Sequence, residues 1–322
     1  RLGISRHRLQ CLGKQPLRLV IPTAAEHFVA LGRQRGSTLQ ITTSDRVIIN
    51  WQDFSIGSGE LTRFLQPSST SSALNRVISG NPSSILGSLQ ANGQIYLINP
   101  NGIMVGAGAQ INCGSFIAST LDVSNDQFMG GGDLNFVGIQ NLESKIQNLG
   151  SINAIGGDVF LIAHKVENLG SISATDGVVG LAAGSEVLLA QAGNERLAVR
   201  VSSEQLAVSS GDGVKNVGLI EGAQAELKAT GNIYAFAINN TGIVRANGSV
   251  TKNGRVILTA GGGSVVSSGA ISARKVSSEQ SAVSSQSSDG SQLTAYSSLN
   301  GGEIRIEGGF VGLGGRIDAS GV

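Results

Sequence analysis

The feature that most limits how this chain can fold is an imperfect repeat in its second half. Residues 148–154 (NLGSINA) recur twenty positions later as residues 168–174 (NLGSISA), and a strand-like segment follows each copy. Looser copies begin at Asn216 and Asn240, and a final one covers residues 314–321. A period near twenty residues is typical of one coil of a β-solenoid, in which short strands meet at Gly or Asn corners. The repeat therefore predicts an all-β fold of stacked coils.

The residues inside one copy indicate how the coils stack. Val159, Leu161 and Ala163 alternate with Phe160 and Ile162, which is the period expected of a strand with one face turned inward. Because Phe160 and Ile162 are also apolar, the outer face of this coil is expected to pack under another segment. Stacking is also expected to align four corner asparagines in a ladder of side-chain amides: Asn148, Asn168, Asn216, Asn240.

Three segments depart from the coil pattern. Residues 1–36 carry seven Lys or Arg against one acid and show no apolar period, which predicts a poorly ordered basic flank before a β-helix domain at residues 37–322. A basic arm or a degraded export signal is the alternative for this flank. Ser-rich insertions near residues 201–213 and 276–298 resemble each other and are expected to project from corners as loops.

Composition excludes several classes of protein. Of 322 residues, 46 are Gly, 4% are aromatic and 14% are charged, with a net charge of +1, which suits thin layers of small side chains and predicts no nucleic-acid partner. Among the few aromatic residues, Trp51 and Phe54 are expected to close one end of the core. Two cysteines, Cys11 and Cys113, are too few for a disulfide framework, and a bond between them stays an alternative. Because the sequence begins with Arg1 and not Met, we expect a fragment of a longer protein.

A search for catalytic residues finds no arrangement with a mechanism. The three histidines lack metal-ligand spacing, and residues 130–133 (GGGD) match one copy of a calcium-binding repeat that needs several. The enzymatic alternative is a polysaccharide lyase or hydrolase on a β-helix, which needs clustered acids on one outer face. Carboxylates are scattered instead, and only Asp158 and Asp176 lie close to one coil apart. We therefore predict no catalytic residue, metal or cofactor.

The strongest turn in the sequence lies in its first third. Residues 94–98 (QIYLI) predict a strand, and the next five residues match a type I turn and the start of another strand: Asn99, Pro100, Asn101, Gly102, Ile103. The side chain of Asn99 can bond back to the backbone, and Pro100 has its φ angle already set. A strand, a fixed corner and a new strand form one edge of a coil.

Ordered blocks around this turn resemble the secretion domain of two-partner-secretion (TPS) exoproteins, the family of filamentous haemagglutinin and the high-molecular-weight adhesins. The supporting residues of the resemblance precede the turn: Asn75, Asn81, Pro82, Gly87, Asn92, Gly93. The resemblance runs from about Ser37 to the end, and includes residues 50–59 (NWQDFSIGSG) and 115–122 (SFIASTLD). The family's second short motif, Asn-Pro-Asn-Leu, has no clear copy here.

The resemblance implies a right-handed parallel β-helix with N-terminal capping strands and short extra-helical hairpins. It implies that residues 99–103 act in secretion, and that the partner is an outer-membrane β-barrel transporter bearing POTRA domains. The implied chain is a monomer that crosses the periplasm of a Gram-negative cell unfolded and folds when secreted or at the cell surface, where a host or neighbouring cell is a further partner. The alternative is a module that itself binds a surface glycan, for which the sequence offers no aromatic strip.

Overall fold

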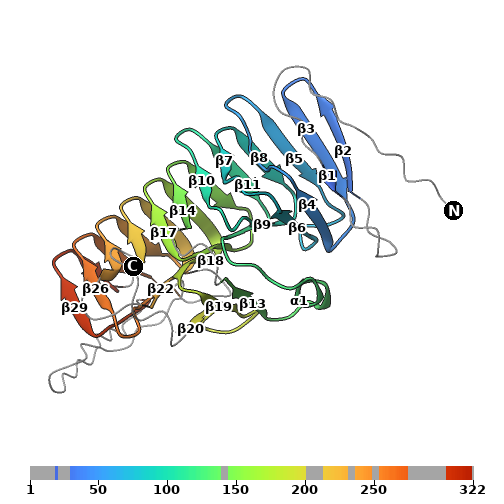
Figure 1. Ribbon diagram of the computed structural model, residues 1–322. Coiled ribbons are helices and arrows are strands. Elements are labelled where there is room, and N and C mark those ends of the chain that lie inside the picture. The colour runs from blue at the N-terminus through green and yellow to red at the C-terminus, as the bar shows by residue number, and fades with distance from the viewer. Residues whose placement is uncertain are drawn as a thin grey trace.

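The computed structural model of the chain describes residues 19–20, 30–138, 144–200, 213–230, 236–248, 254–274 and 302–320. In these ranges the chain winds into a right-handed parallel β-helix, whose coils follow one another from the blue N-terminal end to the red C-terminal end in Figure 1. Each full coil contributes one strand to each of three faces, called A, B and C. The all-β solenoid expected from the repeat is therefore confirmed, and the described ranges add one short helix outside it.

Every strand of a face pairs in parallel with the equivalent strand of the next coil. Face A holds β3 (Thr38–Thr43), β5 (Leu61–Leu65), β8 (Ser88–Ala91), β11 (Gln110–Cys113), β15 (Ser151–Ala154), the first halves of β18 (Ser171–Ala183) and β22 (Leu219–Ala229), β24 (Ile243–Ala246), β27 (Ala270–Ala273) and β30 (Ile317–Asp318). Face B holds β4 (Val47–Trp51), β6 (Ser72–Val77), β9 (Gln94–Ile98), β12 (Ser115–Ser119), β16 (Val159–Ala163), the second halves of β18 and β22, β25 (Arg255–Thr259) and β28 (Glu303–Glu307). Face C holds β7 (Ser83–Ile85), β10 (Ile103–Val105), β14 (Lys145–Asn148), β17 (Lys165–Asn168), β21 (Val214–Asn216), β23 (Phe236–Asn240), β26 (Ser264–Ser267) and β29 (Phe310–Leu313).

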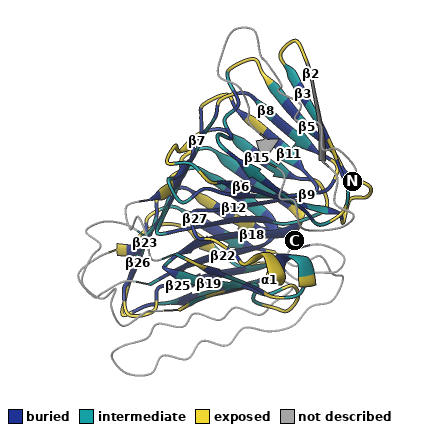
Figure 2. Ribbon diagram, turned by 45° about the vertical axis from the view of Figure 1, so that its right-hand side comes forward, coloured by how far each residue is buried: buried dark blue, intermediate teal, exposed yellow. Residues whose placement is uncertain are grey.

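The interior of the helix is a set of columns of like side chains. Because equivalent strands pair in register, an inward residue of one coil lies over the inward residue of the next. One such column on face A is wholly buried: Ile111, Ile152, Ile172, Ile220, Val244, Ile271. Buried residues run along the strands in Figure 2, while exposed residues gather at corners. Thin layers of small and branched residues thus form the core that the composition suggested.

The asparagine ladder expected at one corner is confirmed. Nδ2 of Asn148 donates to Oδ1 of Asn168 at 2.9 Å, and the same bond joins Asn168 to Asn216 and Asn216 to Asn240, each at 2.8 Å. The ladder ends where Asn240 donates to the hydroxyl of Ser267 at 3.0 Å. All four amides are fully buried. Each therefore finds in the next coil the partner that a buried polar group requires.

A second layer covers part of the outer side of face B. It contains helix α1 (Asn125–Gly130) and an antiparallel sheet of β13 (Leu134–Val137), β19 (Glu186–Leu189) and β20 (Leu197–Arg200). Phe160 and Ile162 lie beneath it in a separate apolar cluster with Phe136 and Val187. The expectation that another segment packs over this coil is therefore confirmed.

Antiparallel strands cap the N-terminal end. Strand β2 (Ala30–Arg35) pairs with β3, and β1 (Leu19–Val20) pairs with β4. Strand pairing thus begins before residue 37, where the sequence suggested that the domain starts. Trp51 and Phe54 are buried in the first coil with their ring centroids 5.1 Å apart. The rest of the basic flank and nearly all of both Ser-rich insertions lie outside the described residues.

Candidate functional site

The turn at residues 99–102 joins β9 to β10 at the corner between faces B and C. The amide of Gly102 donates to the carbonyl of Asn99 at 3.1 Å, which closes the turn, and Oδ1 of Asn99 accepts from the amide of Asn101 at 3.0 Å. Among the described non-glycine residues only Arg46 has a positive φ, so Asn101 cannot occupy the third position of a type II turn. Gly102 leaves the turn with a φ of 111°. The expected type I turn is therefore confirmed.

This turn lies directly on the corner of the preceding coil. Nδ2 of Asn99 donates to the carbonyl of Asn81 at 3.0 Å and to the hydroxyl of Ser83 at 2.9 Å, and Asn99 is fully buried. Nδ2 of Asn101 donates to the carbonyl of Ser79 at 2.8 Å. Two side-chain amides therefore fix one corner upon another, and they bring the Asn-Pro turn at residues 81–82 next to the turn at residues 99–102.

Three supporting residues lie at other corners of the same two coils. Oδ1 of Asn92 accepts from the amide of Gln66, and its Nδ2 donates to the carbonyl of Gln66, both at 2.8 Å. Gly93 has no room for a Cβ, which would overlap the carbonyl oxygen of Ser71 and the side chain of Gln66. A Cβ on Gly87 would overlap the carbonyl oxygens of residues 57 and 60. These glycines are required because neighbouring coils approach closely there.

Asn75 lies apart from the turn. It is buried inside the helix on β6, where Oδ1 accepts from the indole nitrogen of Trp51 at 3.0 Å. The adjacent Arg76 points outward, and its guanidinium binds Asp122 at 2.9 Å and the carbonyl of Val123 at 2.7 Å. Arg76 thereby attaches the segment before α1 to the helix. No local pattern predicts the contacts of Arg76 with Asp122 or of Gln66 with Asn92, because these partners lie far along the chain.

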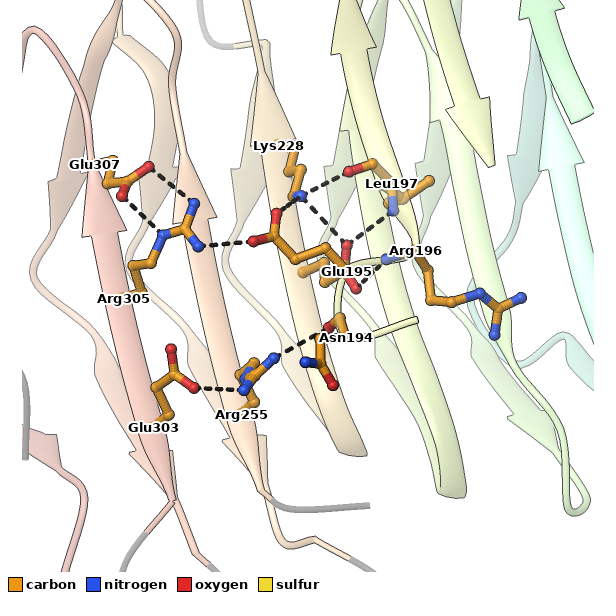
Figure 3. Close-up of polar contacts among 10 residues, drawn as sticks. Asn194, Glu195, Arg196, Leu197, Lys228, Arg255, Glu303, Arg305 and Glu307 are labelled. Atoms are coloured by element: carbon orange, nitrogen blue, oxygen red, sulfur yellow. Dashed lines mark hydrogen bonds and ion pairs between the residues drawn. The ribbon is translucent and has the colours of Figure 1, made fainter. Parts of the chain in front are cut away.

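A charged cluster lies further along face B and is shown in Figure 3. Nζ of Lys228 contacts Glu195 at 2.5 Å, and Arg305 contacts the same carboxylate at 2.7 Å. Glu226 accepts from the backbone amides of Arg196 and Leu197 at 2.7 and 3.0 Å. The cluster binds the segment before β20 to strands β22 and β28.

The cluster perturbs the acidity of both carboxyl groups. Burial raises the pKa of Glu226, which is 1% exposed, despite the nearby ammonium of Lys228. Burial also opposes ionisation of Glu195, but hydrogen bonds and charges from Lys228 and Arg305 outweigh it and hold its pKa below the usual value. Glu195 and Glu226 therefore both help to hold the segment before β20 against strands β22 and β28.

Of the two acids considered for a lyase, only Asp158 makes structural contacts of this kind within the described ranges. Asp158 accepts from the amide of Val178 and forms an ion pair with Arg196 at 2.8 Å, while Asp176 is exposed. Within the described ranges, no three His, Cys, Asp or Glu side chains gather as metal ligands. Searching the same ranges for a helix long and apolar enough to cross a membrane finds none. Cys113 is a buried free thiol, and Cys11 lies outside the described residues.

The architecture matches that of β-helical secretion domains. The crystal structure of the HMW1 secretion domain from Haemophilus influenzae superposes with a TM-score of 0.76 and 30% identity, covering 95% of this chain and 74% of that one. The filamentous hemagglutinin secretion domain shares the fold, with a TM-score of 0.53, 16% identity, and coverage of 94% and 99%. The family model of the TPS secretion domain matches residues 23–273, and the chain belongs to this family.

Two curated relatives match a shorter segment. The heme/hemopexin-binding protein of Haemophilus influenzae is 46% identical over 80 residues, which cover 25% of this chain and 9% of that protein. The corresponding protein of strain ATCC 51907 / DSM 11121 / KW20 / Rd is 44% identical over 87 residues, covering 27% and 10%. The match therefore spans about a tenth of these relatives. The resemblance noted in the sequence is confirmed, and the role of the turn residues stays a prediction.

Proposed function

We propose that this domain directs the export of a large adhesin- or haemagglutinin-like protein, and that an outer-membrane β-barrel transporter with periplasmic POTRA domains recognises it. The observation that carries the proposal is the turn at residues 99–103, which is complete in this member of the family and is bonded to the corner of the preceding coil through the side chains of Asn99 and Asn101. Family membership makes the chain part of a secreted TPS exoprotein. Its destination would be the medium or the cell surface, reached through the periplasm as a monomer.

The corner is suited to start folding as the chain emerges from the transporter. Residues 79–83 and 99–102 are close in sequence, so bringing them together costs little loop entropy. Once Asn99 and Asn101 have bonded to the earlier corner, coils 2 and 3 form an edge on which the next coil can stack. The exposed Asn81 and Pro82 and the half-exposed Pro100 are the parts of the corner that a transporter could contact.

In this proposal, surface binding is carried out by the rest of the exoprotein and not by this domain. Trp51 is buried in the described domain and is therefore not available to stack on a sugar. Attachment to a host or neighbouring cell would belong to segments beyond this domain. The domain itself would supply recognition by the transporter and the first folded coils.

A secretion assay tests the proposal. The 322-residue chain, supplied with a signal peptide, is expressed with and without the cognate transporter, as wild type and as Asn99→Ala/Asn101→Ala. Wild type should reach the medium only with the transporter, and the double variant should be retained. Export of both proteins alike, or export of wild type without the transporter, would contradict the proposal.

Asn216→Ala is the matched control. Asn216 is as deeply buried as Asn99 and also bonds two coils, but it lies in the ladder further along the helix. Asn99→Ala and Asn216→Ala should each cost about 1–3 kcal/mol, because each removes a fully buried amide and leaves its partners without a hydrogen bond. If the corner acts through early folding, the Asn99→Ala/Asn101→Ala variant should lose export, while Asn216→Ala should be exported normally.

A further inference from the structure

The turn contains a chemically reactive sequence, because Asn101 is followed by Gly102. An asparagine before glycine is the most prone to lose its side-chain amide, since glycine offers no side chain to hinder attack by its backbone nitrogen. The sequence contains five such pairs: Asn92-Gly93, Asn101-Gly102, Asn247-Gly248, Asn253-Gly254, Asn300-Gly301. The first three lie wholly within the described residues.

In the folded chain the groups that would react at Asn101 are held by hydrogen bonds. The attacking group is the backbone nitrogen of Gly102, whose hydrogen is donated to the carbonyl of Asn99 at 3.1 Å. The leaving group is Nδ2 of Asn101, which donates to the carbonyl of Ser79 at 2.8 Å and to Oδ1 of Asn99 at 3.3 Å. Attack would require both sets of bonds to break and the turn to open.

Hydrogen bonds also restrain the other two Asn-Gly pairs in the described ranges. The amide of Gly93 donates to the side chain of Gln66 at 3.2 Å, and the side chain of Asn92 is bonded to the backbone of the same residue. The amide of Gly248 donates to the carbonyl of Ala223 at 3.2 Å, and Asn247 donates to Glu221 at 2.6 Å. Folding thus restrains the reacting groups at every pair that the described ranges contain.

We propose that Asn101 is a deamidation site that reacts in the unfolded chain and is protected once the corner has formed. Water or hydroxide removes the proton from the nitrogen of Gly102, and this nitrogen bonds to Cγ of Asn101. The bond from Cγ to Nδ2 breaks, ammonia leaves, and a cyclic imide remains. A water molecule then opens the imide at either carbonyl to give aspartate or isoaspartate. The net reaction consumes one water and releases one ammonia, with no change of oxidation state.

The product cannot rebuild the corner. Aspartate at position 101 has no hydrogen to donate, and its carboxylate would face the carbonyl of Ser79 and Oδ1 of Asn99, which both act as acceptors for Asn101. Isoaspartate adds a methylene to the backbone and moves the nitrogen of Gly102 away from its partner. Deamidation would therefore act as a timer that disables chains left unfolded too long. The effect on export rests on the proposed function, whereas the chemistry and the refolding defect do not.

Mass spectrometry tests the site directly. The full chain is incubated folded in buffer and unfolded in urea at the same mildly alkaline pH, then digested, and the conversion of amide to acid is measured at each Asn-Gly pair. In urea the five pairs should react at comparable rates, which calibrates the measurement. In the folded chain, Asn101 should react at least about tenfold more slowly, because reaction waits for local opening of the turn. Equal rates for Asn101 in the two states would overturn the proposal.

Two variants test the consequence. Asn101→Ala removes the amide without adding charge, whereas Asn101→Asp reproduces one product. The Asp variant should recover less folded protein from urea than the Ala variant, because it adds a carboxylate opposite two acceptors. Refolding of Asn101→Asp to the wild-type yield would overturn the proposed timer. A refolding defect in a protein that is still exported would instead count against the proposed function alone.

Discussion

Glycine sets how closely the coils approach at the corner between faces C and A. There the glycine of each coil lies against the backbone of the glycine before it, in one column: Gly150, Gly170, Gly218, Gly242, Gly269, Gly315. None of them has a positive φ, so the requirement is space and not conformation. The repeated sequence Asn-Leu-Gly therefore combines an amide for the ladder with a residue that lacks a Cβ.

Adding a Cβ to this column should separate the coils. A Cβ on Gly218 would overlap the carbonyl oxygen of Gly170, so Gly218→Ala should destabilise the domain by about 1–3 kcal/mol, as overpacking does. Urea unfolding followed by circular dichroism measures the change. The control is Gly314→Ala, at the adjacent position of the last coil, where a Cβ would meet nothing within 4 Å. Equal stability of the two variants would show that the column is not tightly packed.

Cys113 provides a probe of unfolding. It is fully buried, and burial raises the pKa of its thiol, so the reactive thiolate is suppressed in the folded chain. In a Cys11→Ser background, a thiol reagent should label the protein only as fast as the core opens, and rapidly in urea. Labelling at the same rate with and without urea would mean that the fourth coil, which contains Cys113, opens freely.

At the scale of elements, repetition decides what the sequence can predict. The asparagine ladder was predictable because Asn148 and Asn168 recur at a fixed spacing in matching sequences. The bond from Asn99 to Asn81 was not, because their spacing of 18 residues and different flanking residues do not reveal that their corners coincide. The turn at Asn99 was predictable because its geometry depends only on adjacent residues.

The covering layer, by contrast, could not be predicted in detail from the sequence. The apolar outer residues Phe160 and Ile162 predicted that something covers face B, but not which segment. The cover pairs β13 with β19 across about fifty residues, so Phe136 meets Val187 without any local pattern that links them. Family resemblance implied extra-helical hairpins, and only the fold shows that β13 joins β19 and β20 in one sheet.

The charged cluster beneath β20 predicts a pH effect. The pKa of Glu195 is lowered from 4.5 in the folded state, so its contribution to stability is complete above pH 4.5 and is lost as pH falls through the lower folded value. Glu195→Gln should therefore lower the melting temperature at neutral pH, and its difference from wild type should shrink below pH 4.5. Burial raises the pKa of the neighbouring Glu226, so ionisation of Glu226 costs stability as pH rises in both proteins.

Melting curves across this pH range check the prediction, with Glu186→Gln as the control. Glu186 pairs with Arg200 in the same hairpin, but that pair is more exposed and should contribute little. A melting-temperature difference between Glu195→Gln and wild type that grows as pH falls would contradict the lowered pKa of Glu195.

At the scale of the whole molecule, stability is distributed along a stack in which each coil contacts mainly its neighbours. The middle of the stack is the most enclosed part of the described chain. Strands β12, β16 and β18 have a parallel neighbour on each side, inward residues in the core and outer residues under the covering layer. The last described coil is less enclosed: Phe310 is 61% exposed on β29, and among the described strands β30 pairs with β27 alone.

This gradient predicts the order of hydrogen exchange. Amides of β12, β16 and β18 should exchange slowest, because their release requires the neighbouring coils and the cover to open together. Amides of β29 and β30 should exchange first, since opening them exposes little apolar surface, while the capping strands should make the first coil slower than the last. Exchange followed by mass spectrometry at peptide resolution measures the order. Uniform protection from β3 to β29 would mean that the domain opens as one unit, and the corner at Asn99 could then not fold ahead of the coils that follow it.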